Sequence, residues 1–389
     1  MYNNIEKQKC LCQQCLNNEF NIEDFLVNEG DFKILDNDRP LGISGHMRVR
    51  NEAMSVGECI ESCIDFLDEL IITYNTSTDD TEQILEEYQN KYKDKIRLYH
   101  YKPNLISIKD YVESEFNTKY SKVHYLSNYY NFGYVKIKYK YYMKIDADQI
   151  YFTEKLLSVR EAILKDISSY YLKINNIDTI LWWLPIRKLR YKLRSYFYKK
   201  VKSYYLKNND NNIHDTIINN KIKNNSLAFN MGGFNLVLYK NNFYLKTDKQ
   251  RNIISSYVFN GCVGDHLIWI PKSNSVYFMS KEGWETIRIN YNILNIGFCW
   301  LHLGYIKRNY QINILETSLI SYMDIIRDTN INNKIIDCLE SVISDYFRKT
   351  YSIFFYSFFD IDKKYITKDF CDKFLKKPLE YAIKHFNIE

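Results

Sequence analysis

The alternation of short apolar runs with amphipathic segments between residues 43 and 101 constrains the fold most strongly. Apolar or β-prone runs at residues 43–50, 69–74 and 96–101 predict three strands, and apolar side chains recur at helical spacing between them. Such alternation is typical of a parallel sheet covered by helices. The sequence therefore predicts an α/β fold with a mostly parallel sheet flanked by helices.

Polar side chains stand where the predicted strands end. A further β-prone run at residues 141–145 also ends in polar residues. The residues at these ends are Arg48, Asn51, Glu52, Asn75, Asp146 and Asp148. Because ligands of open α/β sheets bind beyond the carboxyl ends of the strands, we expect these side chains to line one crevice.

Asp146 and Asp148 form a D-x-D pair directly after an apolar strand. Two carboxylates beyond the last pairing of a strand can turn toward one cation, and hard oxygen ligands suit Mg²⁺ or Mn²⁺. Such an ion would neutralise charge on a departing diphosphate. A solvated turn is the alternative interpretation of the same pair.

Changes in composition and periodicity along the chain predict its domain organisation. Hydrophobic residues make up 46% of the 389 residues, with only 12 Gly and 5 Pro, so the chain can bury a core and is neither disordered nor fibrous. Residues 1–40 are polar and weakly periodic, and we interpret them as an N-terminal extension. Residues 41–308 form the expected α/β domain, with a basic aromatic insertion at about 180–225. Residues 309–389 are expected to form a helical C-terminal region.

Residues 182–200 are aromatic, basic and nearly devoid of acidic side chains. On a helix after Pro185, the apolar side chains would share one side, surrounded by Arg and Lys, as in helices that lie on anionic lipid. A basic helix packed on the domain and a nucleic-acid patch are the alternatives. The net charge of +6 fits an anionic partner without choosing one. We expect a membrane surface and no nucleic acid.

Two groups of cysteines have different expected roles. Cys10, Cys12 and Cys15 form a C-x-C-x-x-C pattern that can ligate zinc or an iron–sulfur centre, but no fourth ligand is obvious nearby in the sequence. Unligated thiols in a mobile segment are the alternative. Cys59 and Cys63 lie on one face of a predicted helix with apolar neighbours, which favours core packing.

The sequence also indicates the cellular compartment of the protein. The N-terminus has no apolar region typical of a secretory signal, and no apolar run approaches the length of a membrane span. Nine cysteines are too few for a disulfide scaffold in a chain of this length. We therefore expect a cytoplasmic protein, peripheral on the inner face of the cytoplasmic membrane.

Three ordered motifs carry a resemblance to a known family. They are RVRNEA at 48–53, ITYNTSTDDT at 72–81 and KIDADQIY at 144–151. Together they resemble nucleotide-sugar glycosyltransferases of the GT-A fold, family 2-like. Closer still, they resemble the bacterial β-1,4-N-acetylgalactosaminyltransferases that build lipooligosaccharide. The resemblance covers about residues 42–160 well and is thinner from 226 to 308.

The resemblance implies a GT-A, Rossmann-like catalytic domain at residues 41–308 and a role for each matching residue. The implied nucleotide-sugar contacts are Arg48, Asn51, Glu52, Asn75, Lys144 and Asp146, and the implied metal ligands are Asp146, Asp148 and His302. Asn75 stands where most of the wider superfamily has an aspartate that bonds the uracil. For Lys144, the alternative to a phosphate contact is a structural role at the edge of its strand. For His302, the alternative to a metal ligand is a buried histidine within a strand. Trp284 and Trp300 are either sugar-stacking or packing residues.

The implied reaction is transfer of N-acetylgalactosamine from its UDP-sugar to a lipid-linked oligosaccharide, with inversion and with Mn²⁺ or Mg²⁺. Asp265 is the first candidate for the general base, with Glu282 and Glu285 as rivals. Another UDP-hexose, such as UDP-galactose, UDP-glucose or UDP-N-acetylglucosamine, is the alternative donor. A nucleotidyltransferase is disfavoured because Gly42 and Gly45 are too sparse for a phosphate loop. A non-catalytic membrane-binding protein would leave the D-x-D pair unexplained.

Overall fold

The computed structural model describes residues 10–117, 121–164, 193, 196, 227–239, 242–248, 259–260, 266–287, 292–307, 317–321 and 368–386. The chain divides into two compact units. Unit 1 comprises Met1–Val56, Leu67–Ala147 and Ile270–Asn290, and unit 2 comprises Gly57–Phe66, Asp148–Trp269 and Tyr291–Glu389. The boundary expected at residue 40 does not coincide with a division between the units.

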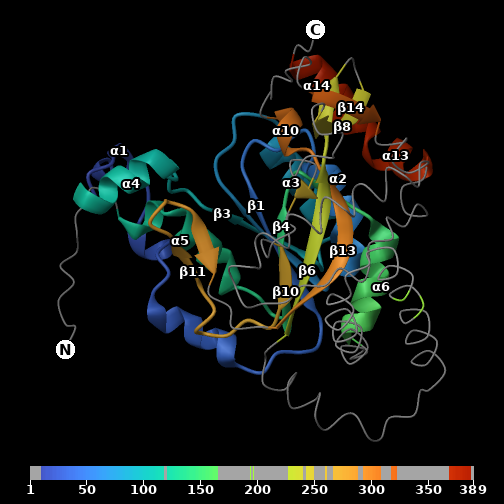
Figure 1. The fold of residues 1–389 in the computed structure, drawn as a ribbon. Helices are drawn as coiled ribbons and strands as arrows, with labels where there is room; N and C mark the ends of the chain where they lie inside the picture. The colour runs from blue at the N-terminus through green and yellow to red at the C-terminus, as the bar shows by residue number, and fades with distance from the viewer. Residues whose placement is uncertain are drawn as a thin grey trace, which may run out of the picture. The chain divides into compact units, whose positions relative to one another are not determined.

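Unit 1 is built on a parallel sheet of four strands. They are β1 (Ile43–Val49), β2 (Glu69–Tyr74), β3 (Ile96–His100) and β4 (Tyr141–Asp146). Their order is β3-β2-β1-β4 and all three pairings are parallel (Figure 1). This order matches the first four strands of the Rossmann order 3-2-1-4-5-6. The expected α/β class with a parallel sheet flanked by helices is confirmed.

Helices and a small hairpin complete unit 1. The helices are α3 (Thr81–Lys91), α4 (Ile108–Asn117) and α5 (Leu126–Tyr134), with the short turn η4 (Lys122–His124) before α5. β11 (Tyr277–Met279) and β12 (Glu285–Ile287) form an antiparallel pair. The Asn131 side chain donates to the carbonyl of Tyr277 at 2.8 Å and accepts from its N–H at 3.0 Å, which fixes α5 against β11.

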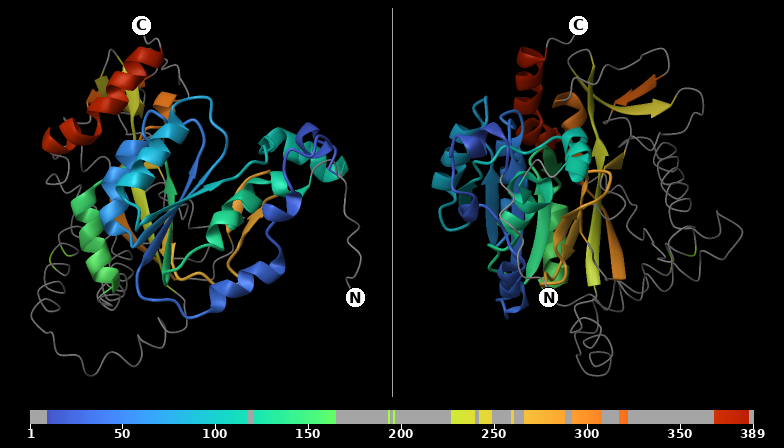
Figure 2. Two further views of the ribbon diagram at one scale, coloured as in Figure 1. Left: turned by 180° about the vertical axis from the view of Figure 1, so that it is seen from behind. Right: turned by 90° about the vertical axis from the view of Figure 1, so that its left-hand side faces the viewer.

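The N-terminal segment packs into unit 1 and does not stand apart as a polar extension. It contains α1 (Gln13–Leu16), η1 (Ile22–Asp24) and η2 (Glu29–Asp36). The ribbon of this segment lies beside that of α4 (Figure 2). Phe25 is buried against Tyr101 and Phe132. The Asn128 amide accepts from the Val27 N–H at 3.0 Å and donates to the Phe25 carbonyl at 2.8 Å. The sequence conceals this packing because the buried side chains sit on short 3₁₀ turns, which have no sustained period.

Unit 2 is built on a mixed sheet. Its strands are β5 (Gln149–Tyr151), β6 (Leu227–Asn235), β9 (Phe259–Asn260), β10 (Leu267–Trp269) and β13 (Asn292–His302). Their order is β10-β6-β13-β5, with β9 also paired to β6. β6 and β13 are parallel, whereas β5, β9 and β10 are antiparallel to their neighbours.

The remaining elements of unit 2 include helices and a second sheet. The helices are α2 (Val56–Cys63), which begins one residue before unit 2, α6 (Thr153–Leu164), α10 (Gly304–Lys307), α13 (Lys368–Phe374) and α14 (Lys376–His385). Cys59 and Cys63 on α2 are buried, which confirms core packing. The second sheet is antiparallel and consists of β7 (Val237–Tyr239), β8 (Asn242–Asp248) and β14 (Thr317–Ser321). In the region 309–389, which was expected to be mostly helical, the described residues form β14, α13 and α14, and the rest of that expectation lies outside the described residues.

No helix within the described ranges is long and apolar enough to cross a bilayer. The basic segment 182–200 lies outside the described residues except for Leu193 and Tyr196, and Tyr196 is exposed. The amphipathic helix expected there therefore stays a prediction.

A buried histidine locks the centre of unit 1. The ring nitrogens of His46 lie 3.0 Å from the Tyr142 hydroxyl and 3.0 Å from the Thr73 hydroxyl. Burial lowers the pKa of His46 to about 3, so the ring is neutral at neutral pH and each nitrogen has a hydroxyl partner. Gly133 on α5 faces this ring directly: a Cβ there would lie 2.1 Å from Nε2 of His46.

We expect Gly133→Ala to lower the free energy of unfolding by about 1–3 kcal/mol, because the hydrogen-bonded His46 ring cannot swing away from the added methyl group. Gly30→Ala is the control, since nothing lies within 4 Å of a Cβ at that exposed position. Urea unfolding of both variants measures the difference. Equal stability of the two would contradict the close packing of α5 on His46.

Candidate functional site

The parallel register brings three strand ends of unit 1 to one edge. Arg48 on β1 pairs with Thr73 on β2 and with Asp146 on β4. Asn75 follows β2, and its N–H donates to the Val49 carbonyl at 2.9 Å. The strand ends converge as expected from the sequence.

Two cationic side chains surround one carboxylate at this edge. Asp146 Oδ1 lies 3.7 Å from Arg48 Nη2 and 4.0 Å from Lys144 Nζ. Arg48 is partly exposed, with 20% of its side chain accessible, whereas Lys144 is buried. Positive charge therefore exceeds negative charge among these three residues, which suits a polyanionic ligand.

Tyr130 on α5 packs against the cationic side chains of Arg48 and Lys144. The Arg48 guanidinium carbon lies 3.5 Å from the centre of the Tyr130 ring, a cation–π contact. The ring stacks on Tyr277 at 4.5 Å, and its hydroxyl donates to Glu285 Oε1 at 2.9 Å. Burial raises the pKa of Tyr130 well above its ordinary value, so the phenol stays protonated and keeps this donor. No spacing in the sequence singles out Tyr130 among the many tyrosines.

Asn75 is buried and has one unmet hydrogen-bonding atom. Its amide nitrogen donates to the carbonyls of Tyr101 at 2.6 Å and Pro103 at 2.9 Å, so both of its hydrogens are used. Its amide oxygen Oδ1 is buried and has no partner. Asn75 can therefore accept a hydrogen bond from a ligand but cannot donate one, although the sequence left both roles open.

Asn51 and Glu52 belong to a loop that is fastened to the loop after β2. Asn51 has a positive φ of 54°, and its Oδ1 accepts from the Thr78 N–H at 2.8 Å. The Glu52 N–H donates to the Thr81 hydroxyl at 2.7 Å. Asp79 accepts from the N–H groups of Ala53 and Thr81 at 3.2 Å and 3.1 Å. The Asn51 side chain and the Glu52 backbone thus shape the loop, and a direct contact to a nucleotide stays a prediction.

In unit 2, Asp148 and His302 face each other. His302 Nε2 lies 3.3 Å from Asp148 Oδ2, and both side chains are largely buried. The antiparallel pairing of β5 with β13 places them together, since Gln149 is the register partner of His302 and Leu303 N–H donates to the Asp148 carbonyl at 2.8 Å. On the other side of the ring, Nδ1 lies 2.5 Å from Asn235 Oδ1.

This arrangement has the chemistry of a divalent metal site. The Asn235 amide oxygen accepts from Nδ1–H, so Nε2 is the ring atom that faces the Asp148 carboxylate and can serve as a ligand. The separation of these two atoms suits one ion, because adjacent ligands of an octahedral ion at ~2.1 Å stand about 3 Å apart. An imidazole ligand favours Mn²⁺ over Mg²⁺. Asn235 could not be identified from the sequence, because no motif around it marks a residue that orients a histidine.

The other candidates are placed as follows. Asp265, the expected general base, lies outside the described residues. Of its rivals, Glu282 is fully exposed, and Glu285 accepts from Tyr130. Trp300 is buried and is therefore a packing residue, whereas Trp284 is 58% exposed and available for stacking.

Comparison with known proteins gives one family match. Residues 46–105 match the model of glycosyl transferase family 2. This segment contains most of β1 with Arg48, all of β2 and β3, and Asn75 directly after β2. No curated protein matches the chain.

Solved structures are similar at low identity. Glucosyl-3-phosphoglycerate synthase from Mycobacterium tuberculosis, in complex with Mn²⁺, UDP and glucosyl-3-phosphoglycerate, is 17% identical with a TM-score of 0.20 over 32% of this chain and 39% of that one. S. aureus TarS is 11% identical with a TM-score of 0.32 over 88% of this chain and 53% of that one. The chain thus spans from about two fifths to about half the length of these two proteins.

We expect Gly304→Ala to weaken Mn²⁺ binding by about 10-fold or more, because such ligand geometry depends on its support. A Cβ at Gly304 would lie 2.5 Å from His302 Cε1 and 2.8 Å from Asp148 Oδ2, so the two side chains would have to move. Titration of Mn²⁺ followed by electron paramagnetic resonance measures the change, with Gly30→Ala as the control. Unchanged Mn²⁺ affinity in Gly304→Ala would exclude this pair as the metal site.

Proposed function

We propose that the protein is a metal-dependent glycosyltransferase that moves a sugar from a UDP-sugar to an oligosaccharide acceptor. The observation that carries the proposal is the alignment of Arg48, Asn75 and Asp146 at the ends of parallel strands. This edge combines an unmet acceptor with two cations, which are the groups that a nucleoside diphosphate needs. The family 2 match over residues 46–105 supports the same class.

Each group of UDP has a counterpart at this edge. The Asn75 Oδ1 atom suits the imide N–H of uracil, which is a donor. Arg48 and Lys144 suit the diphosphate, since both are positively charged and stand beside Asp146. Asp146 suits either the ribose hydroxyls, as an acceptor, or the metal ion.

Asp148 and His302 are the residues that hold Mn²⁺ or Mg²⁺ in this proposal, with Asp146 two residues away in the chain. A bound divalent ion supplies charge neutralisation for the departing diphosphate. Asn235 keeps His302 in the tautomer that presents Nε2 as a ligand.

The reaction is a single displacement with inversion. The acceptor hydroxyl oxygen bonds to the anomeric carbon as the bond from that carbon to the UDP oxygen breaks. A general base takes the hydroxyl proton, and UDP leaves with the electron pair of the broken bond. Arg48 and Lys144 stabilise the growing negative charge on UDP, because their positions are already fixed by Tyr130 and the strand. Asp265 stays the first candidate for the base.

The finer assignments rest on the resemblance and on the charge of the chain. N-acetylgalactosamine is the proposed donor sugar, and a lipid-linked oligosaccharide of the lipooligosaccharide type is the proposed acceptor, by similarity of the three motifs. Net charge of +6 and the basic residues 182–200 support binding to an anionic membrane surface on its cytoplasmic side. Nucleic acid is not a proposed partner.

Purified protein should release UDP slowly from one donor of a UDP-sugar panel when Mn²⁺ is present, because water can replace the acceptor. Asp148→Ala should lose about two orders of magnitude or more of this rate, since the charge on UDP is no longer neutralised. The exposed Asp94→Ala is the matched control and should keep the full rate.

Each outcome of the panel has a separate meaning. Release from UDP-N-acetylgalactosamine alone supports the proposed donor, and release from another UDP-hexose names that one. Absence of release from every donor, together with no UDP binding by calorimetry, would rule the proposal out.

Asn75→Asp should weaken UDP binding even though aspartate is the more frequent residue of the wider superfamily. The carboxylate would face the carbonyls of Tyr101 and Pro103 without a hydrogen to donate, at a cost of about 1–3 kcal/mol for each unmet group. Calorimetric titration with UDP measures the affinity, and thermal unfolding measures the loop. An Asn75→Asp variant with full UDP affinity would show that this side chain does not contact the base.

A further inference from the structure

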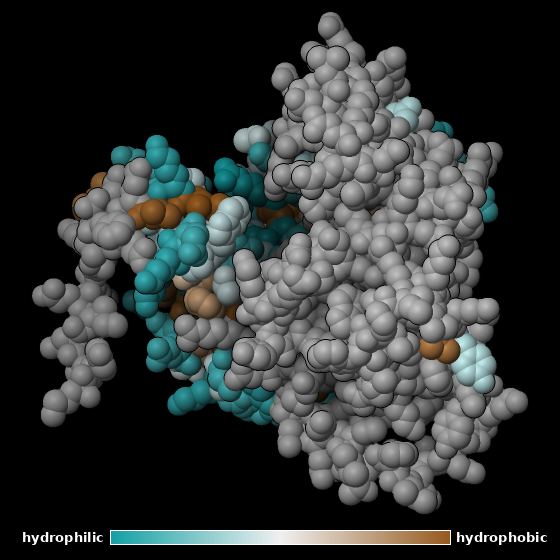
Figure 3. All heavy atoms as spheres, viewed as in Figure 1, coloured by the Kyte–Doolittle hydropathy of each residue, from teal (hydrophilic) through white to brown (hydrophobic). Residues whose placement is uncertain are grey.

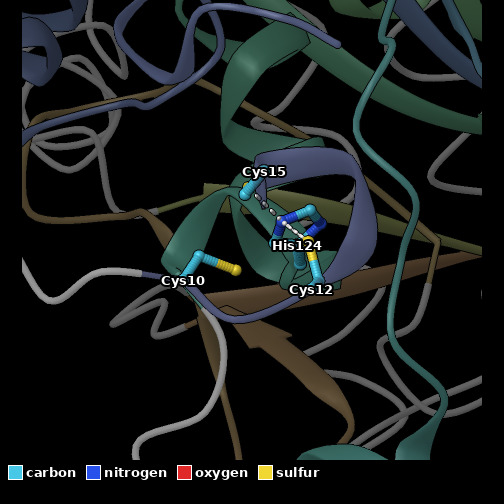
Figure 4. Close-up of side chains that lie close together, drawn as sticks. All are labelled: Cys10, Cys12, Cys15 and His124. Atoms are coloured by element: carbon cyan, nitrogen blue, oxygen red, sulfur yellow. Dashed lines mark hydrogen bonds between the residues drawn. The ribbon is translucent and has the colours of Figure 1, made fainter. Parts of the chain in front are cut away.

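Four metal-binding side chains of unit 1 meet outside the site described above. Cys10, Cys12 and Cys15 of the N-terminal segment surround His124 of η4 (Figure 4). Their ligand atoms all lie within 4.8 Å of one another. Nε2 of His124 lies 3.2 Å from Cys12 Sγ and 3.2 Å from Cys15 Sγ. Cys10 and His124 are buried, and Cys12 and Cys15 are partly buried.

These separations are close to those around one tetrahedral ion. Zinc binds thiolate sulfur at ~2.3 Å and imidazole nitrogen at ~2.1 Å, which puts neighbouring ligand atoms about 3.6–3.8 Å apart. The nitrogen–sulfur distances of 3.2 Å and the bound of 4.8 Å lie on either side of that spacing, so shifts of less than about 1 Å would seat the ion. Thiolates that bind different irons of an iron–sulfur cluster stand farther apart, because the cluster itself lies between them. The geometry therefore favours a mononuclear site.

Hydrogen bonds from the surroundings prepare three of the four groups as ligands, namely His124, Cys10 and Cys12. Nδ1 of His124 lies 2.7 Å from the Asn104 carbonyl oxygen, so it carries the hydrogen and Nε2 directs its lone pair at the sulfurs. The backbone N–H groups of Ser121 and Cys12 donate to Cys10 Sγ, and the N–H of Cys15 donates to Cys12 Sγ. Hydrogen bonds from N–H groups stabilise thiolates, which are the form that binds metal.

We propose that Cys10, Cys12, Cys15 and His124 bind one structural Zn²⁺ with all four positions filled by protein. Three thiolates and one imidazole are soft ligands that select zinc over the Mn²⁺ or Mg²⁺ expected at Asp148 and His302. A set of four protein ligands leaves no open position for a substrate. The zinc therefore has a structural role and takes no part in the proposed reaction.

The zinc ties the N-terminal segment to a loop that Asn75 also contacts. Gln14, which lies between the cysteines, accepts from the Asn104 N–H at 2.7 Å, and His124 donates to the Asn104 carbonyl. The same loop, residues 101–104, offers the carbonyls that hold the Asn75 amide. Apolar side chains lie at the surface around α1 and α4, and Leu11 and Leu16 beside the cysteines are more than half exposed (Figure 3). No residue of α1 is buried, so a metal ion would hold α1 in a way that burial of its apolar side chains does not.

The experiment measures metal in the full chain, expressed with zinc in the medium and purified under reducing conditions without chelator. We expect about one zinc per chain by plasma mass spectrometry. Replacement of zinc by Co²⁺ should give the charge-transfer bands of a cobalt–thiolate bond and the intense d–d bands of a tetrahedral ion. Both readouts use the unaltered protein, so they decide the proposal even if a ligand variant fails to fold.

Variants locate the metal. The triple variant Cys10→Ser, Cys12→Ser, Cys15→Ser should lose at least nine tenths of the zinc, whereas Cys371→Ser, which replaces a thiol on α13, should keep all of it. His124→Ala should lose zinc and His124→Cys should retain it, since a thiolate restores the fourth ligand. A zinc-free protein without cobalt–thiolate bands, zinc retained in the triple variant, or iron in place of zinc would each overturn the proposal.

One consequence rests on the proposed function. Loss of zinc in Cys15→Ser should raise the Kd for UDP several-fold, because residues 101–104 lose a support and Asn75 is no longer held. The zinc content and the cobalt spectrum need no nucleotide, so failure of the zinc proposal and failure of the glycosyltransferase proposal give different results. In enzyme assays, omission of Mn²⁺ is a cleaner test than a chelator, which would also attack the zinc.

Discussion

The parallel pairing of β1 with β2 and β4 is the constraint on which the site in unit 1 depends. One register places Arg48 opposite both Thr73 and Asp146, and it simultaneously places His46 beside Thr73 and Tyr142 in the core. A slip of one residue would turn every side chain of the slipped strand to the opposite face of the sheet. The hydrogen bonds of His46 therefore hold the same register that brings the charged strand ends together.

Hydrogen bonds between loops complete the edge that the strand register forms. The loops after β1 and β2 bond each other through Asn51 and Asp79, and Asn75 bonds the loop after β3. Each of these groups has hydrogen-bond partners within the protein, and the Asn75 Oδ1 atom stands out because it has none. A buried acceptor without a donor costs free energy, so its survival is best explained by a ligand that supplies the donor.

The fold of residues 43–101 and the position of the strand ends could be predicted from the sequence, because local period and strand-end chemistry are written in consecutive residues. Tyr130, Asn235 and His124 could not, because each acts through a partner that is distant in the chain. His124 follows Cys15 by 109 residues, so no spacing rule for zinc ligands reaches it. The packing of the N-terminal segment could not be predicted for a related reason. Phe25 and Phe32 lie directly after or on 3₁₀ turns, whose apolar residues do not recur at a regular spacing.

The chain separates its two proposed ions by ligand chemistry. Carboxylate and imidazole at Asp148 and His302 offer hard and borderline atoms, which exchange Mn²⁺ or Mg²⁺ readily with solution. Thiolates at Cys10, Cys12 and Cys15 bind zinc far more tightly than they bind those ions, so neither site competes for the metal of the other. A structural ion that never leaves and a reacting ion that arrives with its diphosphate make opposite demands on affinity. Different ligand sets meet both demands within one protein.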